Sequence, residues 1–178
     1  MNRKLPFGIV FRIASIHLFV AMLLFLGSCD VTKAPEKGKV VGVSDGDTIT
    51  LLVDGRKEKV RLFGIDCPEL HQAFGRKAKK FTSRMVFHKT VSLTRKETDQ
   101  YGRTLGVIEV DGQYLDQALV RSGYAWHFRK FSSSRLLDSL ENEARLNKRG
   151  LWVDPDAIAP WEFRSRGRQK SMPAIGTM

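Results

Sequence analysis

Lys39 to Ile65 read KVVGVSDGDTITLLVDGRKEKVRLFGI, in which apolar and β-branched runs alternate with short turn sequences. The runs predict three β-strands, at residues 40–43, 48–53 and 59–65. The pairs Asp45-Gly46 and Asp54-Gly55 between them are strong hairpin signals, because Asp and Gly tolerate the positive φ angles of tight turns. This stretch therefore predicts a meander of three strands.

After the meander, the apolar residues recur at a different spacing. Phe74, Ala78, Phe81 and Met85 recur at helical spacing, which predicts an amphipathic helix over residues 72–88. Two further strands are predicted at 91–96 and 104–110, and two further helices at 115–123 and from the serines 132–134 to Gly150. Five strands with a helix between the third and fourth are the order of an OB-type barrel. The predicted fold class is α+β, mainly β: a five-stranded OB-fold barrel with three helices. SH3-like barrels and other small α+β folds are the alternatives.

Length and composition exclude several classes of protein. The chain has 178 residues, of which 42% are hydrophobic and 28% charged, a balance typical of a globular domain and not of collagen-like, low-complexity or multi-span membrane proteins. Lys and Arg number 30 against 19 Asp and Glu, which gives a formal charge of +11. This excess indicates a polyanionic partner: nucleic acid, anionic lipid or acidic polysaccharide.

The first residues have the composition of a targeting segment. Residues 1–28 contain no Asp or Glu, and Arg3 and Lys4 precede an apolar run over residues 13–26. Such a pattern predicts a lipoprotein-type signal peptide at 1–28, because Gly27-Ser28-Cys29 resembles a bacterial lipobox with Cys29 as the lipidated residue. An uncleaved membrane anchor and cleavage by the ordinary signal peptidase are the alternatives. We predict an exported protein, lipid-anchored to a bacterial membrane by its N-terminus or secreted.

The rest of the chain is predicted to have three parts. Residues 29–38 form a polar tether, residues 39–153 form the OB-fold domain, and residues 154–178 form a C-terminal extension. From Arg164 this extension is basic and lacks apolar periodicity, which predicts disorder.

Charged residues gather in three short segments of otherwise apolar sequence: Asp45–Thr48, Arg61–Glu69 and Tyr101–Arg103. Asp47 and Asp66 are hard oxygen donors at two predicted strand ends, and with backbone oxygens and water they suit Ca²⁺ or Mg²⁺. Each segment also has a plainer interpretation, as a turn, a helix cap or a solvent-facing charge.

The neighbouring charges complete a possible hydrolytic site. Glu69 follows Asp66 closely enough to orient or deprotonate a water molecule beside a metal ion. Arg61 and Arg103 come from different strands, and two guanidinium groups suit a phosphate whose negative charge grows in the transition state. Carboxylates, a metal ion and paired arginines are what phosphodiester hydrolysis requires. Spacing alone shows that this arrangement is possible.

The three segments, together with Ala118–Gly123, resemble in their order and separation the thermonuclease (staphylococcal nuclease-like) family, from about Lys39 to Trp152. The resemblance implies an OB barrel with three helices and a calcium-dependent phosphodiesterase that cleaves DNA and RNA to 3′-phosphate products. It also implies the role of each matching residue: Asp47, Asp66 and the Cys67 backbone carbonyl as calcium ligands, Glu69 as the general base or water-orienting carboxylate, and Arg61 and Arg103 as the catalytic, phosphate-binding arginines.

A few positions depart from the family's pattern. Cys67 stands where the prototype has Thr, a change that keeps the backbone carbonyl. Tyr101 matches a tyrosine that contacts a terminal phosphate, whereas its neighbour Gln100 replaces a lysine with the same role. Arg129 and Phe131 fall near the prototype's base-stacking tyrosines, so Arg129 is a candidate substrate-binding residue through cation–π contact with a base.

Two other functions are compatible with these observations. A catalytically inactive OB-fold lipoprotein would bind nucleic acid without cleaving it, although all five matched side chains are retained. A structural lipoprotein would use its basic surface on anionic lipid. The leading prediction is an endonuclease with DNA and RNA as substrates, and no obligate protein partner is predicted.

Overall fold

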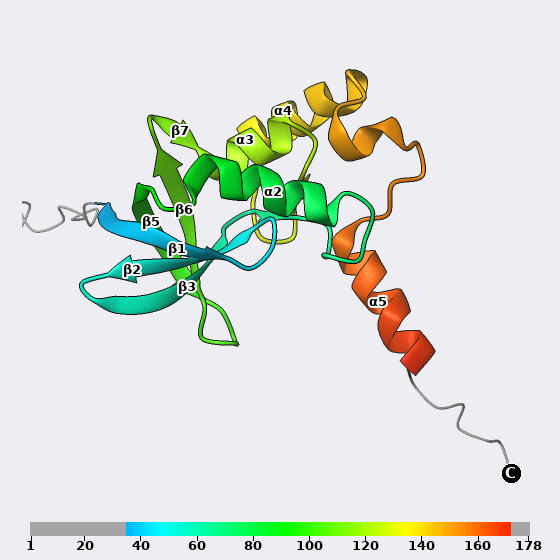
Figure 1. Ribbon diagram of the computed structural model, residues 1–178. Coiled ribbons are helices and arrows are strands. Elements are labelled where there is room, and N and C mark those ends of the chain that lie inside the picture. The colour runs from blue at the N-terminus through cyan, green and yellow to red at the C-terminus, as the bar shows by residue number, and fades with distance from the viewer. Residues whose placement is uncertain (1–34, 172–178) are drawn as a thin grey trace, which may run out of the picture. The chain divides into compact units, whose positions relative to one another are not determined.

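The computed structural model describes residues 35–171, with side chains described as far as Gly167. The elements follow in the order β1 (Glu36–Val43), β2 (Thr48–Val53), β3 (Arg56–Leu62), β4 (Ile65–Asp66), α2 (Gly75–Val86), β5 (Thr90–Thr98), β6 (Thr104–Val110), β7 (Gln113–Tyr114), α3 (Leu115–Arg121), β8 (Trp126–His127), α4 (Arg135–Leu146), the 3₁₀ helix η1 (Gly150–Val153) and α5 (Pro160–Ser171). Figure 1 shows this order in colour, from β1 in blue to α5 in red.

Five of the strands close into a mixed barrel. The strands β3, β2, β1, β5 and β6 pair in this order and are antiparallel, and β3 closes the barrel by pairing in parallel with β6, where Arg61 lies opposite Leu105. One face of each strand points inward, and Val40, Ile49 and Leu93 are among the residues buried there. The closed barrel confirms the predicted α+β class and OB-type fold.

Three helices pack against the barrel and each other. Figure 1 shows α2, α3 and α4 next to one another on one side of the strands. The apolar side of α2 carries the buried residues Ala78, Thr82 and Val86, and α3 packs against α2, α4 and β6. These are the three predicted helices, and each covers apolar side chains that the barrel alone would expose.

The C-terminal extension differs from its prediction. Helix α5 covers Pro160–Ser171, so the prediction of disorder from Arg164 is wrong as far as Ser171. No apolar stripe runs along this helix. Instead, the Trp161 ring in its first turn stacks on Phe128, with ring centroids 5.0 Å apart and an interplanar angle of 5°. This contact joins distant parts of the chain, so the local sequence pattern does not show it.

Only the last part of the predicted N-terminal segments lies within the described residues. β1 begins at Glu36, so the last residues of the predicted 29–38 tether belong to the barrel. The predicted signal peptide at 1–28 and the predicted lipidation residue Cys29 lie outside the described residues. Within residues 35–171, no helix is long and apolar enough to cross a bilayer.

Candidate active site

Asp47 lies in the loop between β1 and β2, and the backbone around it fixes its carboxylate. The loop packs so closely on the chain after β4 that a Cβ on Gly46 would lie 2.7 Å from the Cys67 Cβ, which is why glycine is needed there. Thr82 of α2 donates a hydrogen bond to the Gly46 carbonyl at 2.5 Å. The Cys67 N–H donates to Asp47 Oδ2 at 2.7 Å, and Asp47 is only 2% exposed.

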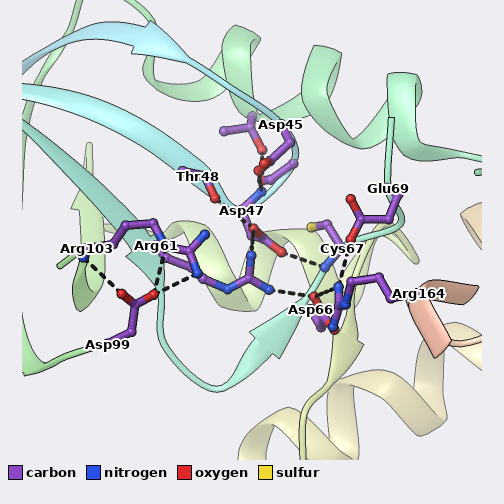
Figure 2. Close-up of polar contacts among 12 residues, drawn as sticks. Asp45, Asp47, Thr48, Arg61, Asp66, Cys67, Glu69, Asp99, Arg103 and Arg164 are labelled. Atoms are coloured by element: carbon purple, nitrogen blue, oxygen red, sulfur yellow. Dashed lines mark hydrogen bonds and ion pairs between the residues drawn. The ribbon is translucent and has the colours of Figure 1, made fainter. Parts of the chain in front are cut away.

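Arg61 joins the two predicted metal-binding aspartates. It lies near the end of β3, donating from Nη1 to Asp47 Oδ1 at 2.8 Å and from Nη2 to Asp66 Oδ1 at 2.5 Å. Gly64, with a φ of 77°, makes the turn that returns β4 and places Asp66 beside Arg61. Figure 2 shows the three side chains in one connected group. The structure thus brings together side chains from two of the three charged segments, Asp45–Thr48 and Arg61–Glu69.

Burial shapes the electrostatics of this group. Burial raises the pKa of Asp47 to about 6, although the charge of Arg61 opposes the shift. It also raises the pKa of Asp66, against the opposing hydrogen bond from Arg164. Burial works against the charge on Arg61, but the two carboxylates outweigh it and raise the pKa of the guanidinium. Two buried carboxylates around one guanidinium favour additional positive charge beside them.

Arg164 supplies such a charge, and the sequence analysis did not predict it as a site residue. Its Nη2 donates to Asp66 Oδ2 at 2.7 Å, and its Nη1 donates to Glu69 Oε1 at 2.7 Å (Figure 2). Through this side chain, the candidate general base Glu69 is connected to the aspartate group. The only sequence signal was the basic composition of the segment, which does not indicate a contact with a site almost a hundred residues earlier.

The backbone of Arg103 lies near Arg61, but its side chain pairs with a different carboxylate. It directly precedes β6, whose Leu105 lies opposite Arg61. Its guanidinium pairs with Asp99 Oδ2 at 2.7 Å, and its N–H donates to Asp99 Oδ1 at 3.0 Å. Tyr101, which is 74% exposed, has its ring 5.5 Å from the Arg103 Cζ. Asp99 is therefore a partner of Arg103 that the sequence analysis missed.

The second candidate substrate-binding residue, Arg129, is held by two carboxylates on α4. Its Nη2 lies 2.7 Å from Asp138 Oδ1 and its Nη1 lies 3.0 Å from the buried Glu141 Oε2. About half of the Arg129 side chain stays exposed, and it lines a surface hollow together with Phe63 and Phe131. This pairing gives Arg129 a structural role in addition to the predicted contact with a base.

The donor set fits a hard divalent cation. Within the part of the chain that the structure describes, no group of three or more His, Cys, Asp or Glu side chains is arranged to hold a metal ion. The paired oxygens of Asp47 and Asp66, however, converge on the single Arg61 guanidinium. Two such carboxylates suit Ca²⁺ when backbone carbonyls and water complete the shell. That the Cys67 backbone carbonyl is a calcium ligand stays a prediction.

The comparisons with known proteins agree with the sequence resemblance. The profile of the family described as "Staphylococcal nuclease homologue" matches residues 59–154. A protein of Escherichia coli O157:H7 named "Uncharacterized endonuclease" is 40% identical over 149 residues, which cover 83% of this chain and 97% of that protein. A protein of Shigella flexneri named "Micrococcal nuclease" is 40% identical over 139 residues, covering 72% of this chain and 80% of its own length.

Proposed function

The chain belongs to the family of staphylococcal nuclease homologues, and from that membership we propose that it is a calcium-dependent endonuclease that hydrolyses phosphodiester bonds of DNA and RNA. The observation that carries the proposal is the connected group of Asp47, Arg61 and Asp66, with Glu69 attached, at one end of an OB-type barrel. A buried acidic group with guanidinium partners is suited to a metal ion and a phosphate together.

Each side chain then has a chemical role. Asp47 and Asp66, with the Cys67 carbonyl, would hold calcium, which would supply the positive charge that a phosphodiester needs for attack by water. Glu69 is partly exposed, so a water molecule can reach its carboxylate, orient there and give up a proton.

The two predicted arginines act on the phosphate. Arg61 and Arg103 donate hydrogen bonds to the phosphate oxygens, and these bonds strengthen as negative charge builds up in the phosphorane-like transition state. Asp99 holds the Arg103 side chain through a 2.7 Å ion pair, which limits the loss of side-chain freedom on binding substrate. Tyr101 and Arg129 contact parts of the nucleic acid away from the reacting bond.

A digestion assay tests this function. The purified chain, incubated with plasmid DNA and separately with RNA, is expected to cleave both in the presence of CaCl₂ and to stop when a chelator removes calcium. Addition of excess CaCl₂ should restore cleavage, because the carboxylates remain intact. Calcium-independent binding of an oligonucleotide without cleavage would instead support an inactive nucleic-acid-binding lipoprotein.

We further propose that Cys29 carries a lipid that anchors the exported protein to a bacterial membrane. The sequence Leu26-Gly27-Ser28-Cys29 after an apolar run supports this proposal. Cells that express the chain and are fed radiolabelled palmitate should incorporate label into it, and Cys29→Ser should abolish the incorporation. Equal labelling of the wild type and Cys29→Ser would contradict the proposal.

A further inference from the structure

The Arg164 side chain lies against the carboxylates that the proposed function assigns to metal binding and to base catalysis. Both oxygens of Asp66 accept hydrogen bonds from it, Oδ2 at 2.7 Å and Oδ1 at 3.3 Å, and Glu69 Oε1 accepts a third at 2.7 Å. Asp66 Oδ1 also accepts from Arg61. Every carboxylate oxygen of Asp66 therefore has a guanidinium partner.

Helix α5 holds Arg164 in this position, one turn after the helix begins. Trp161 precedes Arg164 by three residues, so both side chains lie on one side of the helix. The Trp161 ring stacks on Phe128, with ring centroids 5.0 Å apart, and meets the edge of Trp126 at 5.7 Å. The aromatic contacts set the position of α5, and Arg164 extends from it to the acidic group.

We propose that Arg164 is a built-in competitor of the metal ion: it neutralises Asp66 and Glu69 in the metal-free protein and has to leave them when calcium binds. This inference rests on the proposed function, because it takes calcium as the metal of the site. The segment that carries α5 thereby sets the metal affinity of the nuclease.

The hydrogen bonds of Asp66 favour exchange over joint occupancy. Its Oδ1 accepts from Arg61 and from Arg164, and its Oδ2 accepts from Arg164, so a metal ion bound by this carboxylate takes the place of a guanidinium. A divalent ion and a guanidinium on the same carboxylate oxygen would also repel each other, and such repulsion is costly around a buried side chain.

Arg164 is also the easier of the two arginines to displace. Arg61 belongs to β3, which is paired on one side with β2 and on the other with β6, and its side chain is 18% exposed. The Arg164 side chain is 35% exposed and stands on a helix outside the barrel. Moving the Arg61 side chain would leave two buried aspartates without this partner, whereas Arg164 bonds to one buried aspartate and to the partly exposed Glu69.

Calcium binding to the full-length chain, measured by titration calorimetry, tests the competition. Arg164→Gln removes the competing charge, so the dissociation constant for calcium should fall by about tenfold relative to wild type. The matched control is Arg166→Gln, which removes the same charge from the same helix but has only a 3.9 Å contact with Glu162. It should change the dissociation constant by less than about twofold.

A second variant and a second readout protect the test against misfolding of the first variant. Trp161→Ala removes the anchor of α5 and leaves the carboxylates untouched, so it should also tighten calcium binding. In thermal unfolding without metal, Arg164→Gln should melt below wild type because the acidic group loses its partner, whereas saturating calcium should remove the difference or reverse it.

The possible outcomes separate the inference from the proposed function. If the wild type binds calcium and digests DNA but Arg164→Gln binds calcium equally or more weakly, the competition is overturned and the nuclease proposal stands. If neither the wild type nor the variants bind calcium, the competition and the calcium dependence both fail. If Arg166→Gln tightens calcium binding as much as Arg164→Gln does, only the overall charge of α5 matters. This outcome also overturns the inference.

Discussion

Replacing Glu69 with Gln is expected to lower the rate of DNA hydrolysis by about 10²–10⁴-fold. The amide has nearly the same size and shape as the carboxylate, but it cannot take a proton from water. Glu69 also accepts a hydrogen bond from Arg164 through a carboxylate oxygen, and the carbonyl oxygen of a glutamine can still accept that bond. The fold should therefore persist, and the loss should appear in kcat.

The matched control for this variant is Glu143→Gln on α4, where Glu143 is half-exposed and pairs with Arg149. It should digest plasmid DNA at the wild-type rate, measured with saturating CaCl₂. Wild-type turnover by Glu69→Gln would show that another group activates the water, and the assigned mechanism would be wrong.

Arg61→Lys is expected to lower the rate of hydrolysis by about 10²–10³-fold, even though the charge is kept. Arg61 donates through two different nitrogens to Asp47 and Asp66 at the same time. The single ammonium of lysine cannot reproduce this planar fork, so the two carboxylates lose their common partner and the phosphate loses a paired donor.

The control is Arg56→Lys, at the exposed start of the same strand. It should keep full activity in the same digestion assay. Circular dichroism and thermal unfolding separate a chemical defect from a folding defect, because Arg61→Lys should retain a cooperative transition. A normal rate in both Arg61→Lys and the equivalent Arg103→Lys would contradict the assigned transition-state role.

The sequence was sufficient to predict the barrel because its signals are local. β-branched runs and Asp-Gly turns determine most strands, and a strand lies on each of the five predicted segments, although the turn at Gly64 splits the predicted strand 59–65 into β3 and β4. Asp47 and Asp66 were each predicted at a strand end, and strand ends meet at the rim of a barrel; in the structure both carboxylates contact Arg61.

The contacts that the sequence analysis missed join residues without a shared local pattern. Arg164 meets Glu69 across 95 positions of sequence, where the packing of Trp161 on Phe128 and Trp126 helps to place it. The pairing of Arg129 with Glu141 depends in the same way on how α4 packs. Periodicity describes which face of an element is apolar, but it does not identify the partner that a charged side chain finds.

The close packing of Gly46 against Cys67 makes this thiol a chemical reporter of local opening. The Cys67 residue is 4% exposed, and burial raises the pKa of its thiol well above the usual value, so almost no reactive thiolate is present in the folded chain. An alkylating reagent reaches this buried sulfur only when the packing around it opens, and the Asp47 loop is part of that packing. The rate of iodoacetamide incorporation at this position therefore reports local opening at the end of the barrel that carries Asp47.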